Sequence, residues 1–274
     1  FRTDSMRIAD IYDHFLFDLD GCIYLGDCAI LAAPETLAEL RRLGKKMLFL
    51  TNAPYSSREN FAAKLRRMGI DAREGDIVSS SWAVARYIAR HHDVDGRTAF
   101  VVGSEEFKQD VREAGLRVVE DDDEAKHADF VVIGGYFGFN YKDILLANFA
   151  VRNGAALYTS NRDATFPTPE GLWPGTGAAV AAIECASGKT AISTGKPEPP
   201  MIEVAQAALG PGRTLMVGDR LDSDVEGGKR AGIATALVLT GVTTRDMLPA
   251  SPWVPDYVLE DVGELLTERI RSTD

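Results

Sequence analysis

Short, almost continuous apolar runs alternate with helical patterns along nearly the whole chain, and this alternation constrains the fold more than any other feature. The apolar runs cover residues 14–18, 46–51, 98–103, 129–134, 155–159, 214–218 and 234–240. Because they are nearly continuous apolar runs, without an alternation of apolar and polar positions, they predict strands covered on both faces of a sheet. Strands that alternate with helices form parallel βαβ units, so the sequence predicts an α/β fold.

Helical patterns fill the intervals between the apolar runs. They cover residues 34–43, 57–68, 81–91, 104–115, 141–153, 176–187, 198–209, 222–231 and 261–271. Pro34 suits a first helical turn, and Gly44, Gly69 and Gly115 stand at or just past predicted helix ends. The acidic run Glu120–Glu124 predicts a solvated loop, with metal binding as the alternative.

The length of 274 residues favours two domains, at roughly 150 residues per domain, with a single large α/β domain as the alternative. The chain carries 41 acidic and 30 basic residues, a formal net charge of -11. A field of this sign repels nucleic-acid phosphates and anionic lipids, so we expect neither nucleic acid nor a membrane as a partner. A small anionic ligand is still compatible with this charge, because a metal ion reverses the field locally.

Other features indicate a cytoplasmic protein. No apolar run approaches the roughly 18 residues of a membrane-spanning helix. Residues 1–10 lack the apolar core of a signal peptide, and Met6 is a candidate for the natural start. Cys22, Cys28 and Cys185 form no CxxC pair, which suits a reducing compartment and argues against a disulfide framework or a structural zinc site.

The first segment with candidate chemistry follows the run at 14–18, where Asp18, Asp20 and Gly21 stand close together. Open parallel sheets bind ligands outside the carboxyl ends of their strands, and Asp18 would project from such an end. Gly21 would permit the tight turn that brings Asp20 back beside it. The alternative is an ordinary strand followed by an Asp-Gly turn.

Two further segments supply groups that suit an anion. Thr51 and Asn52 end the second apolar run, and a Thr hydroxyl with the following backbone N–H groups suits phosphate oxygens. The alternative there is a helix cap. Lys196 stands between Gly195 and Pro197, which fix a turn, whereas the alternative is a solvated lysine.

A fourth segment is rich in carboxylates. The run at 214–218 is followed directly by Asp219, with Asp222 and Asp224 shortly after it. These acids could cap the next helix, but three acids exceed what a cap needs.

Together these segments predict one site at the edge of a sheet. The acids that would gather there are Asp18, Asp20, Asp219 and Asp224. Such a cluster repels itself strongly without a cation, and carboxylates with water suit Mg²⁺. With Lys196 and Thr51 gripping an anion, the combination is that of a phosphoryl-transfer site.

With these motifs in this order, the chain resembles the haloacid dehalogenase-like hydrolase superfamily over essentially its whole length. The motifs that carry the resemblance are Asp18-Leu19-Asp20-Gly21, Leu50-Thr51-Asn52, Lys196-Pro197 and Gly218-Asp219-Arg220-Leu221-Asp222-Ser223-Asp224. More narrowly, the chain is similar to the NagD-like, 4-nitrophenylphosphatase subgroup in Thr51-Asn52-Ala53, Gly195-Lys196-Pro197 and Val217–Asp224.

The resemblance implies a role for each motif. Asp18 is implied to be the nucleophile that forms an aspartyl-phosphate, and Asp20 the general acid and base. The groups implied to ligate Mg²⁺ are Asp18, the backbone carbonyl of Asp20 and Asp219, with Asp224 ordering metal-bound water. The residues implied to hold the phosphate are Thr51, Asn52 and Lys196.

The resemblance also implies the domain organisation. It implies a three-layer, Rossmann-like core with a parallel sheet, formed by residues 1–81 and 191–274, and an inserted smaller α/β cap of the C2 type at 82–190. The cap would set substrate specificity through Asn161, Arg162 and Asp163, for which an Asx turn is the alternative. Trp173–Gly177 would border the same cleft, and the family suggests a homodimer. Cys22 stands where many relatives have an aliphatic residue or threonine, and a thiol there would make activity sensitive to oxidation.

We therefore expect a Mg²⁺-dependent phosphatase of small phosphorylated metabolites. Sugar phosphates, glycerol phosphate, phosphoglycolate, nucleotides and 4-nitrophenyl phosphate all stay open as substrates. Two alternatives use the same aspartyl-phosphate: a phosphotransferase or mutase, and a non-catalytic phospho-acceptor switch. Asp20 argues against the switch, because an acid or base beside the nucleophile promotes turnover.

Overall fold

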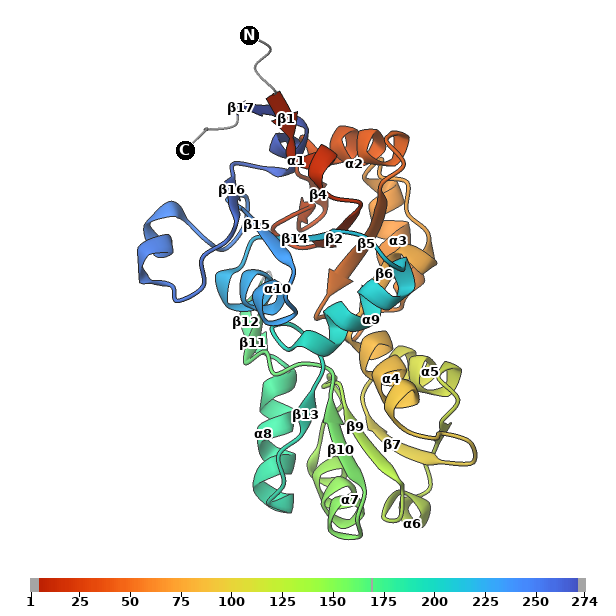
Figure 1. Ribbon diagram of the computed structural model, residues 1–274. Coiled ribbons are helices and arrows are strands. Elements are labelled where there is room, and N and C mark those ends of the chain that lie inside the picture. Colours follow the sequence, from red (N-terminus) through yellow and green to blue (C-terminus); the bar gives the residue numbers. More distant parts are fainter. Residues whose placement is uncertain (1–4, 169, 271–274) are drawn as a thin grey trace. The chain divides into compact units, whose positions relative to one another are not determined.

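The computed structural model describes residues 5–168 and 170–270, which form two compact units (Figure 1). The first unit comprises the chain up to Thr51, Arg58–Val78 and the chain from Ala205 onward. The second unit comprises Asn52–Ser57 and Ser79–Val204. The stretch expected as an insertion, 82–190, lies within the second unit, and residues 191–204 are grouped with it as well.

The first unit is built on a six-stranded sheet in the order β16-β15-β14-β2-β5-β6. These strands are β2 (His14–Asp18), β5 (Lys46–Thr51), β6 (Ile77–Ser79), β14 (Thr214–Gly218), β15 (Ala234–Val238) and β16 (Tyr257–Leu259). The four pairings that join β5, β2, β14, β15 and β16 are parallel. All five residues of β14 are buried, as expected for a strand covered on both faces.

Helices and shorter elements complete the first unit. The helices are α1 (Ile8–Ile11), α2 (Ala33–Arg42), α3 (Arg58–Arg67), α9 (Pro199–Leu209) and α10 (Glu226–Arg230), with α9 running from one unit into the other. The tighter or wider turns are η1 (Glu74–Asp76), η2 (Leu221–Val225), η3 (Arg245–Ala250) and η4 (Val262–Leu266). Two antiparallel pairs are β1 (Ser5–Arg7) with β17 (Glu268–Ile270), and β3 (Tyr24–Leu25) with β4 (Cys28–Ala29).

The register of the three central strands brings their polar ends to one edge. Asp18, the last residue of β2, is paired with Leu50 of β5, so Thr51 follows at the neighbouring strand end. On the other side of β2, Phe17 is paired with Val217, so Asp219 follows the end of β14. The sheet therefore presents a threonine and two aspartates at adjacent strand ends.

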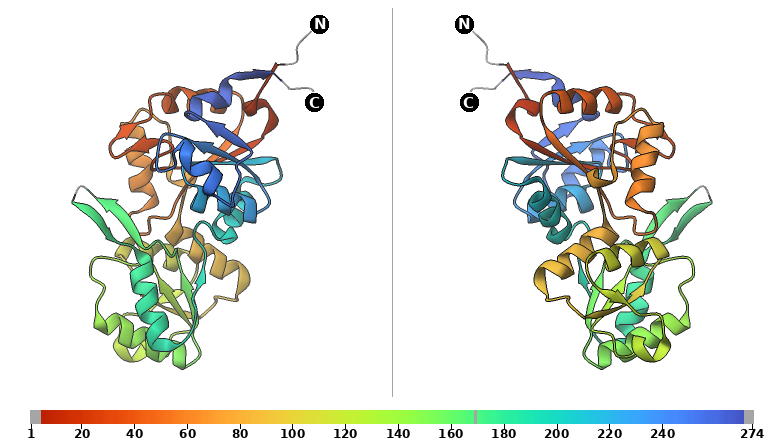
Figure 2. Two further views of the ribbon diagram at one scale, coloured as in Figure 1. Left: turned by 90° about the vertical axis from the view of Figure 1, so that its left-hand side faces the viewer. Right: turned by 90° about the vertical axis from the view of Figure 1, so that its right-hand side faces the viewer.

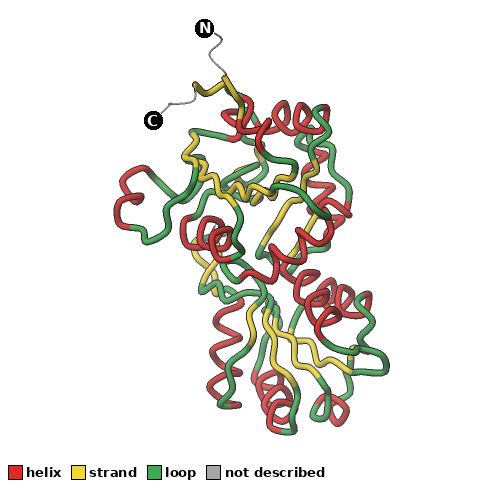
Figure 3. The backbone as a smooth tube through the Cα atoms, viewed as in Figure 1, coloured by secondary structure: helices red, strands yellow, loops and turns green. Residues whose placement is uncertain are grey.

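The second unit contains a five-stranded parallel sheet in the order β13-β10-β9-β7-β8. Its strands are β7 (Thr98–Val102), β8 (Arg117–Val118), β9 (Phe130–Ile133), β10 (Ala156–Thr159) and β13 (Ile192–Ser193). Its helices are α4 (Ser80–His91), α5 (Glu105–Glu113), α6 (Asp122–Ala125), α7 (Tyr141–Arg152) and α8 (Thr176–Ser187). Figure 3 shows how helices and strands alternate along the chain in this unit.

Alternate residues of the second sheet enter two separate cores. Phe100 and Val131 pack with residues of α7 and α8 on one face. Val101 and Val132 pack with residues of α4 and α5 on the other face. Because successive side chains of a strand point to opposite faces, this division shows three layers, with the sheet between two layers of helices.

The predicted α/β class and the parallel sheets are confirmed, and each of the seven apolar runs contains a strand. The predicted helix at 261–271 is wrong: η4 is followed by strand β17, which pairs with β1, and residue 271 lies outside the described residues. The predicted helix at 222–231 begins with the π-helical turn η2. The acidic run at 120–124, expected as a loop, contributes to α6, whose first turn is capped by the Asp121 carboxylate.

A hairpin in the second unit was not predicted from the sequence. Strands β11 (Thr165–Thr168) and β12 (Gly171–Pro174) pair antiparallel and form a two-stranded sheet of their own. This hairpin extends away from the five-stranded sheet of its unit (Figure 2). None of the helices among the described residues has the length and hydropathy of a membrane-spanning segment.

Candidate active site

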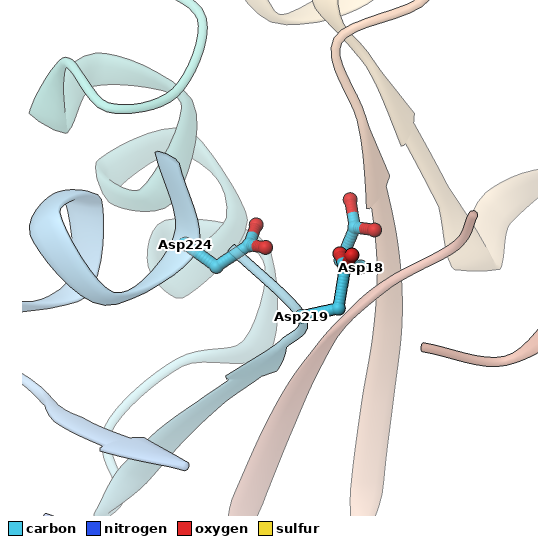
Figure 4. A group of neighbouring side chains, drawn as sticks. All are labelled: Asp18, Asp219 and Asp224. Carbon is cyan, nitrogen blue, oxygen red and sulfur yellow. The ribbon is translucent and has the colours of Figure 1, made fainter. Parts of the chain in front are cut away.

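Three carboxylates from distant parts of the chain converge in the first unit. Each of Asp18, Asp219 and Asp224 offers one oxygen, and these oxygens all lie within 4.8 Å of one another. Asp18 ends β2, Asp219 follows β14, and Asp224 belongs to η2, so the three reach the cluster from separate elements (Figure 4). Asp219 and Asp224 are each only 1% exposed.

Glycines leave the space that these carboxylates occupy. Gly21 has a φ of +88°, and a Cβ added there would lie 2.5 Å from Asp219 Oδ2. A Cβ at Gly241 would also meet the Asp219 carboxylate, and a Cβ at Gly218 would meet the Asp224 carboxylate. The acids are thus enclosed by backbone that approaches more closely than any side chain would allow.

Backbone amides orient the two buried acids. Val242 N donates to Asp219 Oδ2 over 2.6 Å, and Arg220 N donates to Asp224 Oδ2 over 3.1 Å. The turn η2 also returns the Asp224 backbone to its start, where Asp224 N donates to Arg220 O over 3.1 Å. The chain therefore fixes both carboxylates before any ligand binds.

The cluster fits a divalent cation. Two unit charges no more than 4.8 Å apart repel by at least about 3.5 kcal/mol at an effective dielectric constant of roughly 20. A cation removes that cost, and three carboxylate oxygens are the donors that a hard ion such as Mg²⁺ takes. The residues present thus match the metal that the sequence implied.

Asp20 differs from the other predicted acids. The structure does not include its side chain in the cluster, and that side chain reaches solvent beyond the end of β2. Desolvation by the surrounding protein raises the pKa of Asp20, while the charge of Lys64 acts in the opposite direction. A carboxyl with a raised pKa is a better proton donor near neutral pH than an ordinary aspartate.

The predicted oxidation-sensitive thiol is enclosed. Cys22 is 0% exposed, and its Sγ donates weakly to Val217 O over 3.6 Å. The turn of which it is part is held by Leu19 O, which accepts from Cys22 N and Ile23 N. Burial of this kind limits the access of oxidants.

The residues predicted to hold phosphate lie in both units. Thr51 ends β5 in the first unit and is 9% exposed. Asn52 and Lys196 belong to the second unit, where two hydrogen bonds join them. Asn52 Nδ2 donates to Lys196 O over 2.9 Å, and Lys196 N donates to Asn52 Oδ1 over 3.0 Å. The Lys196 side chain is almost fully buried, at 2% exposure.

Close backbone packing explains the glycine before this lysine. A Cβ at Gly195 would lie 2.9 Å from both Asn161 Cβ and Asn52 Oδ1 and would collide with Ser160 O. Only a residue without a side chain lets the segment pass so close to Asn52. The Gly-Lys pair is thus a packing requirement as well as a chemical one.

The three predicted specificity residues point to different neighbours. Asn52 Nδ2 donates to Asp163 Oδ2 over 3.1 Å, and Asn161 Nδ2 donates to Asn52 O over 2.7 Å. Asp163 N donates to Asn161 Oδ1 over 3.0 Å, as in an Asx turn. Arg162 instead binds Glu184 of α8 through its guanidinium, with Nη2 2.6 Å from Glu184 Oε1. This ion pair lowers the pKa of Glu184.

A pocket of about 580 Å³ in the second unit adjoins this network. Asn52, Asn161 and Asp163 line it, and Arg162 does not. Aromatic side chains of the β11–β12 hairpin, Phe166 and Trp173, line it as well. Trp173–Gly177 were predicted to border a cleft, whereas Phe166 was not predicted to do so. The sequence signal for Phe166 is its spacing from Trp173 about the hairpin turn, which makes the two residues cross-strand partners.

Comparisons with known proteins find relatives along nearly the whole chain. A profile described as haloacid dehalogenase-like hydrolase matches residues 15–117, and one described as HAD-hydrolase-like matches residues 193–265. An acid sugar phosphatase of Staphylococcus aureus is 34% identical over 259 residues, which cover 94% of this chain and 98% of the relative.

Two solved structures are similar over almost the same length. The p-nitrophenyl phosphatase from Archaeoglobus fulgidus has a TM-score of 0.85 and 32% identity, and the match covers 93% of this chain and 98% of that one. The glycerol phosphate phosphatase from Mycobacterium tuberculosis, in complex with magnesium, has a TM-score of 0.87 and 35% identity, with 95% and 78% covered. The chain belongs to the haloacid dehalogenase-like hydrolase family and, within it, to the NagD-like 4-nitrophenylphosphatase subgroup of phosphoric monoester hydrolases.

Proposed function

We propose that this chain hydrolyses small phosphate monoesters with Mg²⁺ as its metal, through an aspartyl-phosphate on Asp18. The observation that carries the proposal is the convergence of Asp18, Asp219 and Asp224 at the carboxyl edge of the first sheet. Relatives named as acid sugar, glycerol phosphate and nitrophenyl phosphatases support the substrate class. A relative solved with magnesium supports the metal.

In the first half-reaction, an Asp18 carboxylate oxygen attacks phosphorus, and the bond from phosphorus to the ester oxygen breaks. Asp20 donates its proton to that departing oxygen, so the leaving group departs as an alcohol. The raised pKa of Asp20 suits this donation. The phosphoryl group stays on the chain as an acyl phosphate of Asp18.

In the second half-reaction, water attacks the phosphorus of this acyl phosphate and gives one proton to Asp20. The bond between Asp18 and phosphorus breaks, so inorganic phosphate forms and both aspartates return to their starting states. Monoester hydrolysis needs accelerations of up to about 10²¹-fold, and division into two steps lowers the barrier of each.

The remaining groups balance charge. Asp18, Asp219 and the Asp20 carbonyl would hold Mg²⁺, with Asp224 close by, and the ion when bound neutralises charge on the phosphate oxygens. Thr51, Asn52 and Lys196 are proposed to hold the same phosphate, with the buried Lys196 ammonium as a fixed positive charge. We also propose that the enzyme is cytoplasmic and that the second unit selects the substrate.

The test is the substitution Asp18→Asn, which keeps the side-chain volume but removes the nucleophilic oxygen. We expect hydrolysis of 4-nitrophenyl phosphate with Mg²⁺ to fall by roughly four orders of magnitude or more. The control is Asp27→Asn, because Asp27 is an exposed aspartate of the first unit outside the cluster. Turnover close to that of the control would refute the nucleophile.

The same assay separates hydrolysis from transfer. Inorganic phosphate is measured beside phosphorylated product, with glycerol added as an alternative acceptor. Hydrolysis predicts that nearly all phosphoryl groups appear as inorganic phosphate. Stoichiometric transfer to glycerol would favour a phosphotransferase, and a lasting phospho-Asp18 without release would favour a switch.

A further inference from the structure

A short stretch of the first unit, residues 240–243, follows β15 and lies beside the carboxylate cluster. Leu237 of β15 pairs with Gly218 of β14, and Asp219 comes directly after Gly218. Because the two strands are parallel, the chain beyond β15 leaves the sheet at the same edge as Asp219. This stretch contributes no residue to the predicted site, yet its position brings it to the proposed metal ligands.

Three successive residues of the stretch contact Asp219. A Cβ at Gly241 would collide with the Asp219 carboxylate, so the backbone there lies directly against that carboxylate. Val242 N donates to Asp219 Oδ2 over 2.6 Å, and Thr243 N donates to Asp219 O over 3.2 Å. The side chain and the backbone of Asp219 are thus both held by one short piece of main chain.

The residue that begins the stretch binds a different part of the site. Thr240 Oγ1 donates to Gly21 O over 2.6 Å, near the short end of the range for hydroxyl donors. Gly21 belongs to the turn after β2 that carries Asp20, whose carbonyl is a proposed ligand of the metal. The Thr240 hydroxyl therefore connects the turn of Asp20 to the stretch that holds Asp219.

The turn needs such a connection because it contains a glycine. Gly21 has a φ of +88°, and a Cβ there would lie 2.5 Å from Asp219 Oδ2, so only glycine allows this approach. The absence of a side chain also gives the backbone more conformational freedom than another residue would. A hydrogen bond to Gly21 O removes part of that freedom, because it fixes the plane of the peptide between Gly21 and Cys22.

Other hydrogen bonds of the turn do less to set its distance from Asp219. Gly21 N donates to Tyr24 O over 2.8 Å, which closes the turn on itself. The Cys22 thiol faces β14, but a thiol is a weak donor and its sulfur lies 3.6 Å from the acceptor. Of these two links from the turn to later strands, the one from Thr240 is the stronger.

We infer that Thr240 is a positioning residue of the metal site, because its hydroxyl holds the Asp20–Gly21 turn in a fixed position relative to Asp219. The inference rests on the proposed phosphatase function and adds a residue to its machinery. Without the hydroxyl, the peptide after Gly21 rotates more freely, and the Asp20 carbonyl and Asp219 are less well directed toward one ion. Groups that orient metal ligands from outside typically contribute roughly 10- to 100-fold to metal affinity.

The test is Thr240→Val, which keeps the β-branched shape of the side chain but removes the donor. We expect the dissociation constant for Mg²⁺, measured by isothermal titration calorimetry on the intact chain, to rise by roughly 10-fold. Thr240→Ser restores a hydroxyl and should return the dissociation constant nearly to the wild-type value.

Thr244 supplies a matched control. It is exposed, and its hydroxyl donates to Asp246 Oδ1 over 2.5 Å, a carboxylate that is not part of the cluster. Thr244→Val removes a hydroxyl from the same part of the chain and should leave the dissociation constant for Mg²⁺ unchanged. An equal rise in Thr244→Val and Thr240→Val would overturn the inference, because the bond to Gly21 would then have no particular effect.

A purely structural role for Thr240 predicts a different result. Loss of one hydrogen bond should lower the Tm in EDTA by about 2–4 °C, whichever role the residue has. If Thr240 only stabilised the fold, added Mg²⁺ would raise the Tm of Thr240→Val as much as that of the wild type. If it positions the metal ligands, the rise should be smaller in Thr240→Val, because the ion binds the folded protein less tightly.

Failure of this inference and failure of the proposed function are distinguishable. A wild type that binds Mg²⁺ no more tightly than Thr240→Val does would overturn the inference alone. A wild type that binds no Mg²⁺ would overturn the proposed function and the inference with it. Thr240→Ala removes the same hydroxyl and provides the same comparison if Thr240→Val does not fold.

Discussion

The buried acids depend on neighbours that carry no functional group. Asp219 fits because Gly21 and Gly241 have no side chains, and Asp224 fits because Gly218 has none. A side chain at any of these positions would collide with a carboxylate and displace it, which would alter the geometry of the metal site. The precision of the cluster is therefore a property of the glycines as much as of the acids.

Substitution of Asp224 should weaken the metal site without changing the fold. Asp224→Asn keeps the acceptor for Arg220 N but removes one of three charges that a cation would neutralise. We expect the Mg²⁺ concentration for half-maximal phosphatase activity to rise by roughly 10- to 100-fold. Titration of activity with Mg²⁺ measures this change.

The control for that prediction lies two residues away. Asp222 is in the same turn, η2, but its carboxylate is paired with the Arg220 guanidinium and its side chain is 70% exposed. Asp222→Asn should leave the Mg²⁺ requirement unchanged. An equal shift in both variants would show that the charge of the segment, and not the cluster, determines affinity.

At the scale of the elements, the same hydrogen-bond arrangement joins neighbouring strands in both units. In each case an aspartate just before one strand accepts hydrogen bonds from a threonine of the neighbouring strand. In the second unit, Asp129 before β9 accepts from Thr98 N over 2.8 Å and from Thr98 Oγ1 over 2.9 Å at the start of β7. In the first unit, Asp256 before β16 accepts from Thr235 N over 2.7 Å in β15. A basic side chain forms an ion pair with each aspartate: Arg97 with Asp129 in the second unit, and Lys229 with Asp256 in the first. Each arrangement fixes the register of two parallel strands.

The hydrogen bonds to the Asp129 carboxylate should make the free energy of unfolding depend on pH. Burial alone would raise the pKa of Asp129, but hydrogen bonds from Thr98 and Arg97 outweigh it and hold that pKa below its ordinary value. A carboxyl whose pKa is lower in the folded state than in the unfolded state stabilises the fold at pH values above its unfolded-state pKa, near 3.9. This stabilisation is lost as the pH falls through the folded-state pKa. Asp129→Asn should therefore lower the free energy of unfolding by about 1–2 kcal/mol at pH 7.

Denaturant unfolding at several pH values checks this prediction. The difference between wild type and Asp129→Asn should be constant down to about pH 4 and shrink below it. Asp95→Asn serves as the control, because Asp95 is an exposed aspartate in the loop before β7. If the difference in the free energy of unfolding were the same at pH 2 as at pH 7, the charge of the Asp129 carboxylate would not contribute to stability.

The strands could be predicted from the sequence because their signal is local. The seven apolar runs needed no partner to be recognised, and the acids after two of them followed from where parallel strands end. The register that brings Thr51, Asp18 and Asp219 to adjacent strand ends adds the spatial order. Local pattern was therefore sufficient for the four inner strands of the first sheet and for three acids of the cluster, whereas the outer strands β6 and β16 were not predicted.

Features that depend on distant pairing could not be predicted in this way. Val262 and Leu265 have helical spacing, yet the following residues pair with β1 at the opposite end of the chain. The direction of the Arg162 side chain depends on Glu184, which lies on a helix later in the sequence. The turn of residues 161–163 was visible locally, but the choice of which side chains enter the pocket was not.

At the scale of the whole molecule, the chain carries a net charge of -11, and part of that charge is concentrated in one self-repelling cluster. A cation that binds the folded cluster stabilises the protein by about 2.7 kcal/mol at 100 times its dissociation constant. For units of this size, that corresponds to a rise in Tm of roughly 5–10 °C.

Calorimetry with added Mg²⁺ or with EDTA measures this effect. The rise in Tm should be strongly reduced in Asp224→Asn, and NaCl at equal ionic strength should not reproduce it. If NaCl raised the Tm of the wild type as much as Mg²⁺, the stabilisation would come from screening of the overall charge. Cation binding at the cluster would then not contribute to the stability of the protein.

The pairing of β2 with β14 also has a consequence for biosynthesis. The partner on one side, β5, leaves the ribosome soon after β2, but β14 begins only at Thr214, after the chain of the second unit is complete. At a synthesis rate of about 5–20 residues per second, β2 spends many seconds with one edge unpaired. A ribosome stalled between Val204 and Thr214 would hold a finished second unit beside an unfinished first one. The nascent chain is therefore exposed to misassembly until Asp18, at the end of β2, meets Asp219 and Asp224.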